Sequence, residues 1–490
     1  MMIAKNKLIK LVEEHFEREL LKENYEVKTI KPLKILTNTR FDLAFKLFYL
    51  DMKDKNNNLA KKIYTEHIRA FSLGKFQEPE NKEKNSIDKF IKEFDKTFED
   101  IKLNGFNQDK TLIPLSVNGS IANGAHRVSS AIHLNKEVNC VEIDTSNHIY
   151  DYNFFYQRKV SENLLDMVAT KFIEYAHNVY IAFIWPIGIK KDEDINNLIP
   201  NIVYKKTIKL STNGAHNLLS QIYYGEEWLG NVENNFSGVN EKLIECFKTF
   251  DSFEVIAFQV DKFEDVLKIK EKIRAVFKIG KHSVHITDTK EEAIRVSNTI
   301  FNKNTLHFLN YAKPNKYKST HIRIEKFKEF LTKNSIEIKD AILDSGMILS
   351  AYGLRVCSDI DYFVLDNNKI TSYDKELEYH DEELKYHDEK KINLLYDSKN
   401  YFYFNNVKFI SFNQLYKMKK SRAEEKDLND CRMMEGLLEN NKFKEIFNKI
   451  KQKVYYAKIK LRSRIIEYIK VFGLYSVARK IYRNIKAKNE

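Results

Sequence analysis

Apolar positions along the chain follow two spacings, which predict strands and helices in alternation. Residues 254–260, EVIAFQV, are an apolar run typical of a buried strand, and residues 262–279 place apolar side chains at helical spacing. Residues 179–189 form a second apolar run that indicates a buried strand. The last part of the chain predicts a helix at 324–334 and then strands at 338–344, 359–365, 391–397 and 401–411.

The N-terminal part has a more varied pattern. Residues 1–21, MMIAKNKLIKLVEEHFERELL, predict an amphipathic helix. Residues 111–143 predict strand, turn, strand, glycine turn, helix and strand in that order. Farther along, residues 374–391 are polar, contain a near repeat of Tyr-His-Asp-Glu, and predict an exposed helix or loop.

These patterns divide the chain into four segments of α/β and α+β character, so we expect a multidomain protein. The expected segments are a first domain at 1–150, a middle α+β domain of unassigned role at 151–325, a third domain at 326–440 and a basic amphipathic helical tail at 441–490. A length of 490 residues fits several domains, because a single core stops growing at roughly 250–300 residues.

The composition is that of a globular protein. Hydrophobic residues make up 43% of the chain and aromatic residues 13%, which excludes a disordered protein. The four cysteines form no CxxC pair, so neither a zinc knuckle nor a disulfide framework is indicated, and a reducing cytoplasm fits best. No apolar run reaches the ~20 residues that are needed to span a bilayer.

The net charge is +13, and part of this excess lies in the tail. Residues 451–490 hold twelve Lys or Arg and two Glu, and apolar side chains recur among them at helical spacing. Such a helix predicts peripheral contact of residues 443–490 with the anionic inner face of a membrane; packing against its own domain is the alternative. We therefore expect a cytoplasmic protein with this peripheral contact, and a nucleic-acid partner is not favoured.

The candidate chemistry is concentrated in residues 345–365, SGMILSAYGLRVCSDIDYFVL. Asp359 and Asp361 are two apart on a predicted strand, so their carboxylates project from one face. Paired carboxylates suit Mg²⁺, or Mn²⁺ in its place, and such a cation can neutralise a transferring phosphoryl group. The glycine turn at Gly346 offers backbone N–H groups to a phosphate, and Arg355 could pair with the same phosphate.

A solvated Asp-x-Asp at a strand end is the alternative interpretation, and it is favoured for an isolated pair. In this chain the pair is not isolated, because a predicted strand, a glycine turn, a helix and a second strand with the acids follow one another. We therefore interpret the acid pair as catalytic and metal-binding.

This order of elements resembles the nucleotidyltransferase superfamily, in which a glycine turn and a helix lead to a strand with Asp-x-Asp. Within it, the stretch is most similar to phosphotransferases typified by bacterial choline-phosphate transferases of the LicD type and by fukutin, which have Asp-x-Gly-Thr-Leu-Leu-Gly, an arginine and Asp-Ile-Asp. The corresponding residues are Asp344, Ser345, Gly346, Met347, Ile348, Leu349 and Ser350, then Arg355, then Asp359 and Asp361. The resemblance, over residues 335–435, implies transfer of a phospho-alcohol or phospho-sugar from a CDP-linked donor to a glycan.

The resemblance also implies roles for individual residues. Asp359 and Asp361 would be catalytic and would hold the metal, and the candidates for binding the nucleotide or donor are Ser345, Gly346, Arg355 and Ser358. A third catalytic carboxylate often lies on a later strand of such sites, and we select Asp397 for it. An aspartate that forms a turn before Ser398 is the alternative.

Two further segments near the acids have two interpretations each. His380 and His387 are candidates for general bases, and the alternative is that they are surface histidines of a charged helix. Residues 417–432, KMKKSRAEEKDLNDCR, would flank the nucleotide by analogy with nucleotidyltransferase-like domains. The alternative is a solvated helix with ion pairs between successive turns.

A second glycine turn lies in residues 123–127, NGAHR, between a predicted strand and an amphipathic helix. Gly124 permits the turn, and His126 and Arg127 add donors at a helix N-terminus, so the arrangement suits a phosphate or nucleotide. It resembles the ParB/sulfiredoxin-like fold, in which a Gly-x-His-Arg turn holds nucleotide phosphate; the cysteine of sulfiredoxin chemistry is missing here. A structural arginine that ties the turn is the alternative. Asn-Gly-Ala-His recurs at residues 213–216, again beside a predicted helix.

Three functional hypotheses follow from these motifs. The first is a Mg²⁺-dependent phospho-group or nucleotidyl transferase of bacterial surface-glycan synthesis, such as capsule or lipooligosaccharide, with a glycan or lipid-linked glycan as acceptor. A nucleotide site at residues 124–127 would make it bifunctional, with a kinase-like activity in its N-terminal part. The second is a ParB-like DNA-binding partition or regulatory protein, which lacks a helix-turn-helix and leaves the acid pair unexplained. The third is a nucleotidyltransferase that modifies protein or RNA.

Overall fold

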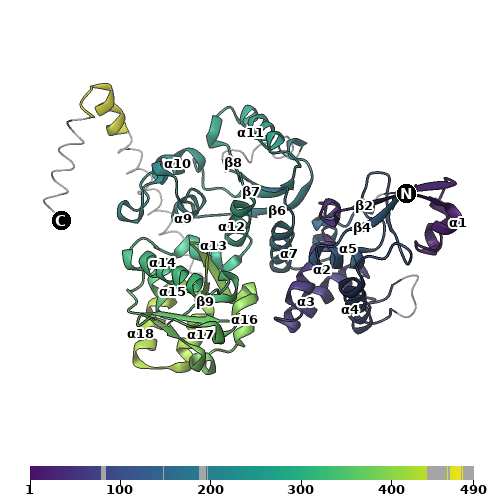
Figure 1. Cartoon of the computed structure of the whole chain (residues 1–490). Coiled ribbons are helices and arrows are strands. Elements are labelled where there is room, and N and C mark those ends of the chain that lie inside the picture. The colour runs from purple at the N-terminus through teal and green to yellow at the C-terminus, as the bar shows by residue number, and fades with distance from the viewer. Residues whose placement is uncertain are drawn as a thin grey trace.

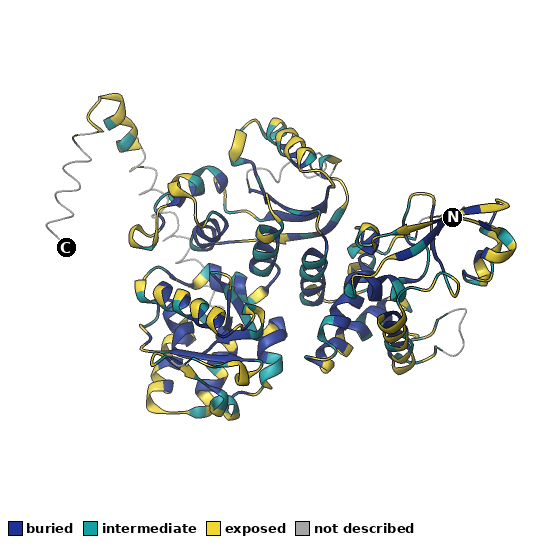
Figure 2. Ribbon diagram, viewed as in Figure 1, coloured by how far each residue is buried: buried dark blue, intermediate teal, exposed yellow. Residues whose placement is uncertain are grey.

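Three small sheets, each with helices packed around it, organise the chain in the computed structural model (Figure 1). The structure describes residues 1–78, 84–146, 148–186, 195, 197–372, 374–438, 461, 464–475 and 477. The mixed α and β character that the sequence predicts is confirmed. Buried residues are concentrated in the strands and on the inner faces of the helices (Figure 2).

The N-terminal sheet has the strand order β1-β2-β4-β3, with β3 parallel to β4 and the other pairs antiparallel. Its strands are β1 (Met2–Ala4), β2 (Asn24–Ile30), β3 (Ile113–Leu115) and β4 (Val138–Glu142). The helices of this part are α2 (Asp42–Met52), α3 (Asn57–Phe71), α4 (Ile87–Asn104) and α5 (Ala125–His133).

The amphipathic helix predicted over residues 1–21 is wrong. The segment instead contains strand β1, the single turn of α1 (Lys5–Leu8) and the 3-10 helix η1 (Glu14–Glu19). Its apolar residues Leu8, Leu11 and Phe16 are buried in a small core with Tyr25 and Val27 of β2. Burial against β2, which the local sequence does not reveal, therefore replaces a continuous helical face.

The middle sheet is antiparallel, with the order β6-β7-β5-β8. Its first and third strands in the chain are central, as in a split βαβ unit. The strands are β5 (Val179–Ile184), β6 (Ile202–Ile208), β7 (Phe253–Gln259) and β8 (Val284–Ile286). The helices are α6 (Tyr152–Gln157), α7 (Glu162–Tyr175), α9 (Thr212–Ile222), α10 (Val239–Cys246), α11 (Phe263–Phe277), α12 (Lys290–Ile300) and α13 (Lys303–Tyr311).

The predictions for this middle part agree with the structure at the strands and at one helix. All residues of β7 are buried, as the apolar run predicted, and α11 follows it. The second Asn-Gly-Ala-His segment, residues 213–216, lies in the first turns of α9. There the Asn213 and Asn217 amides donate to carbonyl oxygens at the end of α13, including Leu309 at 3.2 and 2.8 Å. This segment therefore joins two helices.

The C-terminal sheet is mixed, with the order β11-β10-β9-β13-β12. β10 runs antiparallel to β9 and parallel to β11, and β13 runs parallel to β9. The strands are β9 (Ala341–Leu343), β10 (Ile360–Val364), β11 (Leu377–Tyr379), β12 (Tyr401–Phe404) and β13 (Val407–Ile410). The helices are α14 (Lys318–Lys333), α15 (Gly346–Ala351), α16 (Lys391–Tyr396), α17 (Phe412–Arg422) and α18 (Glu425–Leu438).

One predicted strand of the C-terminal part is wrong, one real strand is missing from the prediction, and the single strand predicted at 401–411 is a hairpin of β12 and β13. Residues 391–397 form helix α16, whose Leu394 and Leu395 are buried. The strand beside β10 is β11, which lies in the polar stretch 374–391 that predicted an exposed helix or loop. β11 has three residues, too few for an alternating pattern to identify it.

A continuous core joins the three sheets. One cluster of buried apolar side chains includes residues from the first helices of the chain, the middle sheet and the C-terminal sheet. Polar contacts add to it between distant segments, because Lys55 Nζ lies 3.1 Å from Asp340 Oδ1 and the Asn56 amide donates to Asn393 at 3.0 Å. The N-terminal part therefore contacts the sheet that carries the acid pair.

The predicted tail at 441–490 lies mostly outside the described residues. Of its described positions, Ile465, Tyr468, Val471 and Phe472 are exposed. No helix in the described part of the chain combines the length and the apolar character needed to cross a membrane.

Candidate functional site

The predicted acid pair lies at the end of the C-terminal sheet where β9 ends and β10 begins. Asp359 directly precedes β10 and is half-buried, whereas Asp361 lies within β10 and is 6% exposed. Asp361 is opposite Glu378 in the parallel pairing of β10 with β11. His380 directly follows β11, and ligand atoms of Asp361, Glu378 and His380 all lie within 4.8 Å of one another.

A fully buried aspartate supports this group from the end of β9. Asp344 is 0% exposed, its backbone N–H donates to the Asp361 carbonyl at 2.7 Å, and its Oδ2 lies 3.3 Å from His380 Nδ1. His380 Nε2 in turn lies 3.3 Å from Asp361 Oδ1, so the imidazole bridges the two carboxylates. The side chain of His387, also buried, brings Nε2 to 3.5 Å from the same Asp344 oxygen.

The two aspartates of this cluster titrate in opposite directions. Burial raises the pKa of Asp361 to about 7, and the neighbouring Asp359, Asp344 and Glu378 carboxylates add to that rise. Burial acts in the same sense on Asp344, but its two histidine neighbours hold its pKa well below the usual range. Burial opposes the charged form of His380, yet Asp344 and Asp361 raise the pKa of this imidazole. The carboxylates gathered around Asp361 therefore favour a bound proton or cation at this group.

The glycine turn that precedes α15 faces Asp359. A Cβ added to Gly346 would lie 3.8 Å from Asp359 Oδ1 and 3.2 Å from Cys357 Cβ, so the absence of a side chain lets the turn approach the acid. Ser345 has φ +49°, a conformation that is strained for a residue with a side chain and is common at functional sites. Its hydroxyl is buried and has no hydrogen-bond partner in the described structure. The predicted neighbourhood of Ser345, Gly346 and Asp359 is thus brought together.

Ser358 and Arg355 are near the acids but already have partners. The Ser358 hydroxyl donates to Asp359 Oδ2 at 2.9 Å. The Arg355 guanidinium forms a two-pronged ion pair with Asp430, at 2.7 Å from Nε and 2.9 Å from Nη2. A donor phosphate at Arg355 would have to share the guanidinium with Asp430.

The helices that follow the sheet place their charges inward. Lys419 is 1% exposed and lies 2.8 Å from Asp427 and 2.9 Å from Asp430, and Arg422 pairs with Asp427 at 2.7 Å. Arg422 also reaches Glu383 at 2.8 Å. Residues 417–432 therefore form an ion network and not a solvated helix, and this network joins α17 and α18 to the loop before β10 through Arg355 and to the segment after β11 through Glu383.

No protein-family model, curated protein or solved structure matched this chain.

Asp397, selected from the sequence as the third carboxylate, is not brought to the pair. It follows α16, its carboxylate accepts from the Lys399 backbone N–H at 3.2 Å, and it lies 3.8 Å from Lys399 Nζ. These contacts correspond to the alternative of a turn-forming aspartate. Glu378 is the carboxylate that lies beside Asp361.

The sequence named His380 and His387 only as candidate general bases and Asp344 only as a position of the motif, and it did not indicate that the three residues lie together. His380 and His387 are buried, which corrects their interpretation as surface residues of a charged helix. The signal for the histidines was the near repeat of Tyr-His-Asp-Glu in the sequence. In the structure, both histidines of this repeat lie beside Asp344.

The N-terminal glycine turn has its shape as predicted but its side chains lie differently. Gly124 has φ +92°, and a Cβ there would lie 2.8 Å from Ile113 Cδ1. His126 points into the helices, where its Nε2 hydrogen bonds to Tyr64 at 2.7 Å and its ring stacks on Phe94. Burial, followed by nearby lysines, holds the pKa of His126 well below its usual value, so the ring is neutral.

Arg127 is engaged within the protein. Its Nη2 lies 2.6 Å from Glu13 Oε1, and Nη1 donates to the Thr111 hydroxyl and to the Leu112 carbonyl at 3.3 Å. These contacts support the alternative of a structural arginine that ties the turn. Arg127 also borders a cavity of about 460 Å³ that α4 lines with residues including Lys96 and Asp100.

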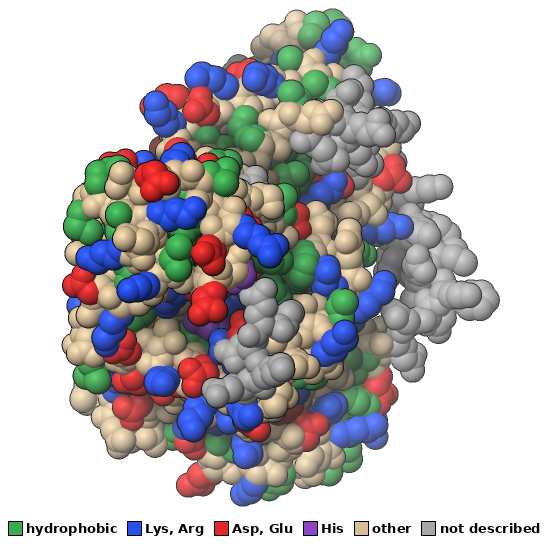
Figure 3. Space-filling view, turned by 90° about the vertical axis from the view of Figure 1, so that its right-hand side faces the viewer, with side chains coloured by type: hydrophobic (Ala, Val, Ile, Leu, Met, Phe, Trp, Pro, Cys, Tyr) green, Lys and Arg blue, Asp and Glu red, His purple; other side chains and the backbone are tan. Residues whose placement is uncertain are grey.

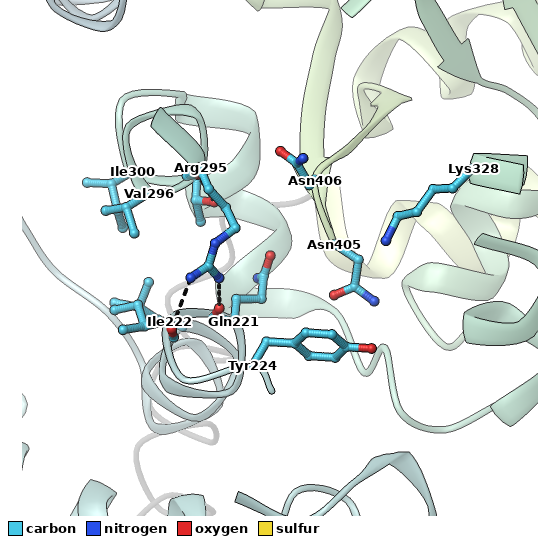
Figure 4. Close-up of a pocket in the computed structure, with 11 residues that line it drawn as sticks. Gln221, Ile222, Tyr224, Arg295, Val296, Ile300, Lys328, Asn405 and Asn406 are labelled. Atoms are coloured by element: carbon cyan, nitrogen blue, oxygen red, sulfur yellow. Dashed lines mark hydrogen bonds between the residues drawn. The ribbon is translucent and has the colours of Figure 1, made fainter. Parts of the chain in front are cut away.

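A separate cavity of about 220 Å³ lies between the middle and C-terminal parts (Figure 4). Arg295 of α12 donates there to the Gln221 carbonyl and to the Ile222 carbonyl at 3.2 Å, which are at the end of α9. Asn405 and Asn406, at the turn between β12 and β13, close the opposite side. Because β13 is parallel to β9, this turn lies at the end of the sheet opposite the acid cluster.

Proposed function

We propose that the chain is a divalent-cation-dependent phospho-group or nucleotidyl transferase whose site is the acid cluster of the C-terminal sheet. The observation that carries the proposal is the placement of Asp359 against the Gly346 turn, with Asp361 and Glu378 beside it on adjacent strands. A glycine turn next to paired carboxylates suits phosphate transfer assisted by a cation, because the turn offers N–H groups to a phosphate and the carboxylates can hold the cation. The resemblance to nucleotidyltransferases supports the same reaction class.

The residues of the cluster suit a divalent cation. Oxygens of Asp361 and Glu378 would hold it, with Asp359 as a further candidate ligand, and Glu378 is exposed, which leaves one side open to substrate. When bound, the cation would neutralise charge on the transferring phosphoryl group. The unpartnered Ser345 hydroxyl would bind the donor phosphate, while Ser358 would orient the Asp359 carboxylate through its hydrogen bond.

We propose a CDP-linked donor and a glycan or lipid-linked glycan acceptor, in bacterial capsule or lipooligosaccharide synthesis. This part of the proposal rests on the resemblance of residues 344–361 to the LicD and fukutin type. The exposed apolar residues of the tail, such as Tyr468 and Phe472, agree with peripheral contact with a membrane that holds such an acceptor.

The N-terminal turn does not enter the proposal as a second nucleotide site. Its His126 and Arg127 have internal partners, and these partners account for both side chains. On the face of the molecule seen in Figure 3, acidic and basic side chains are intermixed over the described residues. Such a surface differs from the one-sided basic track of a DNA-binding protein.

A thermal-shift screen tests the proposal. CTP, CDP-alcohols, ATP and UDP-sugars are each added to the full-length protein with Mg²⁺ or Mn²⁺, and at least one should raise Tm only when the cation is present. Asp359→Asn should lose that rise. Asp366→Asn, at an exposed aspartate two residues beyond the far end of β10, is the matched control and should keep it.

Two results would overturn the proposal. One is a screen in which no nucleotide gives a cation-dependent shift, and the other is an Asp359→Asn protein that keeps the full shift. If the shift is found, incubation with radiolabelled donor and either glycan, RNA or the protein itself identifies the class of acceptor and separates surface-glycan synthesis from macromolecule modification.

A further inference from the structure

An imidazole nitrogen faces the cation site from the end of β11. His380 Nε2 lies 3.3 Å from Asp361 Oδ1, and Glu378 completes the group within 4.8 Å. Glu378 is exposed and His380 is buried, so the three ligand atoms line a position that is open on one side. Two carboxylates and one imidazole are ligands typical of first-row transition cations.

Asp344 fixes the orientation of this imidazole. An ionised carboxylate only accepts hydrogen bonds, so His380 Nδ1 donates to Asp344 Oδ2 over 3.3 Å and Nε2 is directed at Asp361. Histidine ligands of metals almost always donate their other N–H to a carboxylate or carbonyl in this way. Asp344 is itself held, because its backbone N–H donates to the Asp361 carbonyl at 2.7 Å.

Buried polar atoms without hydrogen-bond partners near the cluster are an independent indication that a ligand binds there. Asp344 Oδ1 and the Ser345 hydroxyl are buried and have no hydrogen-bond partner within the described structure. Buried polar atoms in native proteins are almost always paired, with protein or with an ordered group. The Asp344 carboxylate contacts His380, and Ser345 belongs to the turn that faces Asp359, so these unpaired atoms lie beside the acid cluster.

We propose that His380 is a nitrogen ligand, positioned by Asp344, that makes the site selective for Mn²⁺ or a similar transition cation over Mg²⁺. The inference rests on the proposed function, because it concerns the cation of the same site. Mg²⁺ is a hard cation that takes oxygen ligands and dehydrates reluctantly, whereas imidazole favours the transition cations. The competing arrangement is a doubly protonated His380 that simply joins Asp344 and Asp361 without any metal.

Electron paramagnetic resonance of Mn²⁺ added to the full-length protein tests the inference. Bound Mn²⁺ should show spin-echo modulation from one directly coordinated ¹⁴N nucleus. His380→Gln should abolish the modulation and weaken Mn²⁺ binding more than Mg²⁺ binding. Asp344→Asn should keep a bound Mn²⁺ and weaken its affinity about 10- to 100-fold, the usual effect of losing a partner of a metal-bound histidine.

The matched control is His285→Gln. His285 is also a histidine paired with a carboxylate, at 3.1 Å from Glu292, but it lies in the middle sheet and should leave Mn²⁺ binding and the ¹⁴N modulation unchanged. Circular dichroism of each variant verifies folding. If Asp344→Asn fails to fold, the His380→Gln comparison decides alone.

The outcomes separate this inference from the proposed function. Mn²⁺ bound without a ¹⁴N signal, or no binding of Mn²⁺, overturns the nitrogen ligand. In the first case a nucleotide-induced shift with Mg²⁺ still supports the transferase. A ¹⁴N signal that disappears in His380→Gln, together with no nucleotide-induced shift, supports the nitrogen ligand and overturns the transferase.

Discussion

The two glycine turns of this protein differ in what their polar side chains already contact. Both precede a helix, and both suggested a phosphate site in the sequence. At the N-terminal turn, His126 is hydrogen bonded to Tyr64, and Arg127 donates to Glu13. At the C-terminal turn, the buried Ser345 hydroxyl has no partner in the described structure, and the next residue, Gly346, faces the Asp359 carboxylate. A shared backbone shape therefore does not imply a shared use.

The largest expected effect that separates the two turns is the removal of Asp361. Asp361→Asn should abolish the cation-dependent nucleotide shift and weaken Mn²⁺ binding by about 100-fold or more, because it takes away a charged ligand. Without ligand, its Tm at pH 8 should equal or exceed that of the parent, since the raised pKa of about 7 means that burying the charged form is costly.

Calorimetry with Mn²⁺ and melting curves at pH 8 measure both effects. Arg127→Ala is the counterpart at the other turn and should keep the nucleotide shift. A nucleotide shift lost in Arg127→Ala but kept in Asp361→Asn would reverse the comparison between the turns.

Alanine substitutions at Gly124 and Gly346 should have different effects: the first should lower mainly the stability of the fold, and the second mainly nucleotide binding. Gly124→Ala combines φ +92° with a contact of 2.8 Å to Ile113 Cδ1, so we expect a loss of about 2 kcal/mol of unfolding free energy. Gly346→Ala meets Cys357 Cβ at 3.2 Å and should cost under about 1 kcal/mol, but it should weaken the nucleotide shift. Urea unfolding measures the first quantity and thermal shift the second. Equal losses of stability would contradict the distinction.

Acid should destabilise the N-terminal turn through His126. Burial lowers the pKa of this imidazole in the folded protein, so the unfolded chain takes up the proton first. Protonation of His126 in the unfolded chain therefore leaves the unfolding free energy unchanged above the ordinary histidine pKa of about 6.5. Below this pH it lowers the unfolding free energy, by about 1 kcal/mol at pH 5.5. His126→Gln, which can still hydrogen bond to Tyr64, should show a shallower pH dependence in urea titrations. An unchanged slope would place the proton uptake elsewhere.

The smallest expected effect is the coupling between Arg127 and Glu13. The pair is partly exposed, and a double-mutant cycle with Arg127→Ala and Glu13→Ala should give about 0.5–1 kcal/mol. A coupling near zero would mean that the hydrogen bonds of Arg127 to Thr111 and Leu112 tie the turn by themselves.

The parts of the site that follow from local sequence were predictable. Asp359 and Asp361 were expected to lie close together because residues two apart on a strand share a face, and Asp359 does directly precede β10, which carries Asp361. The glycine turn that precedes them is also a local signal. Glu378 was not predictable in this way, because it reaches Asp361 only through the register of β10 with the three-residue β11. Asp397 was chosen because residues 391–397 were taken for a strand, and burial of Leu394 and Leu395 as a helix overrode that pattern.

The same limit applies to the fold. Long apolar elements such as β7 and α11 were predicted because their patterns extend over many residues. The residues 1–21 gave a helical pattern, yet β1 pairs with β2 from Asn24 onward, and pairing between segments overrides local preference. The contact of His380 and His387 with Asp344 brings together three separate segments of the chain. In the sequence, only the near repeat that contains the two histidines was visible.

The shared core has a consequence for attempts to divide the chain. A fragment that begins at residue 326, the boundary that the sequence suggested, would start in the middle of α14. It would lose Ile324 and the whole of α13, whose Phe308 stacks on Phe402 of β12. The freed surface would invite aggregation. The smallest fragment that keeps the C-terminal sheet folded should therefore start upstream of Lys303.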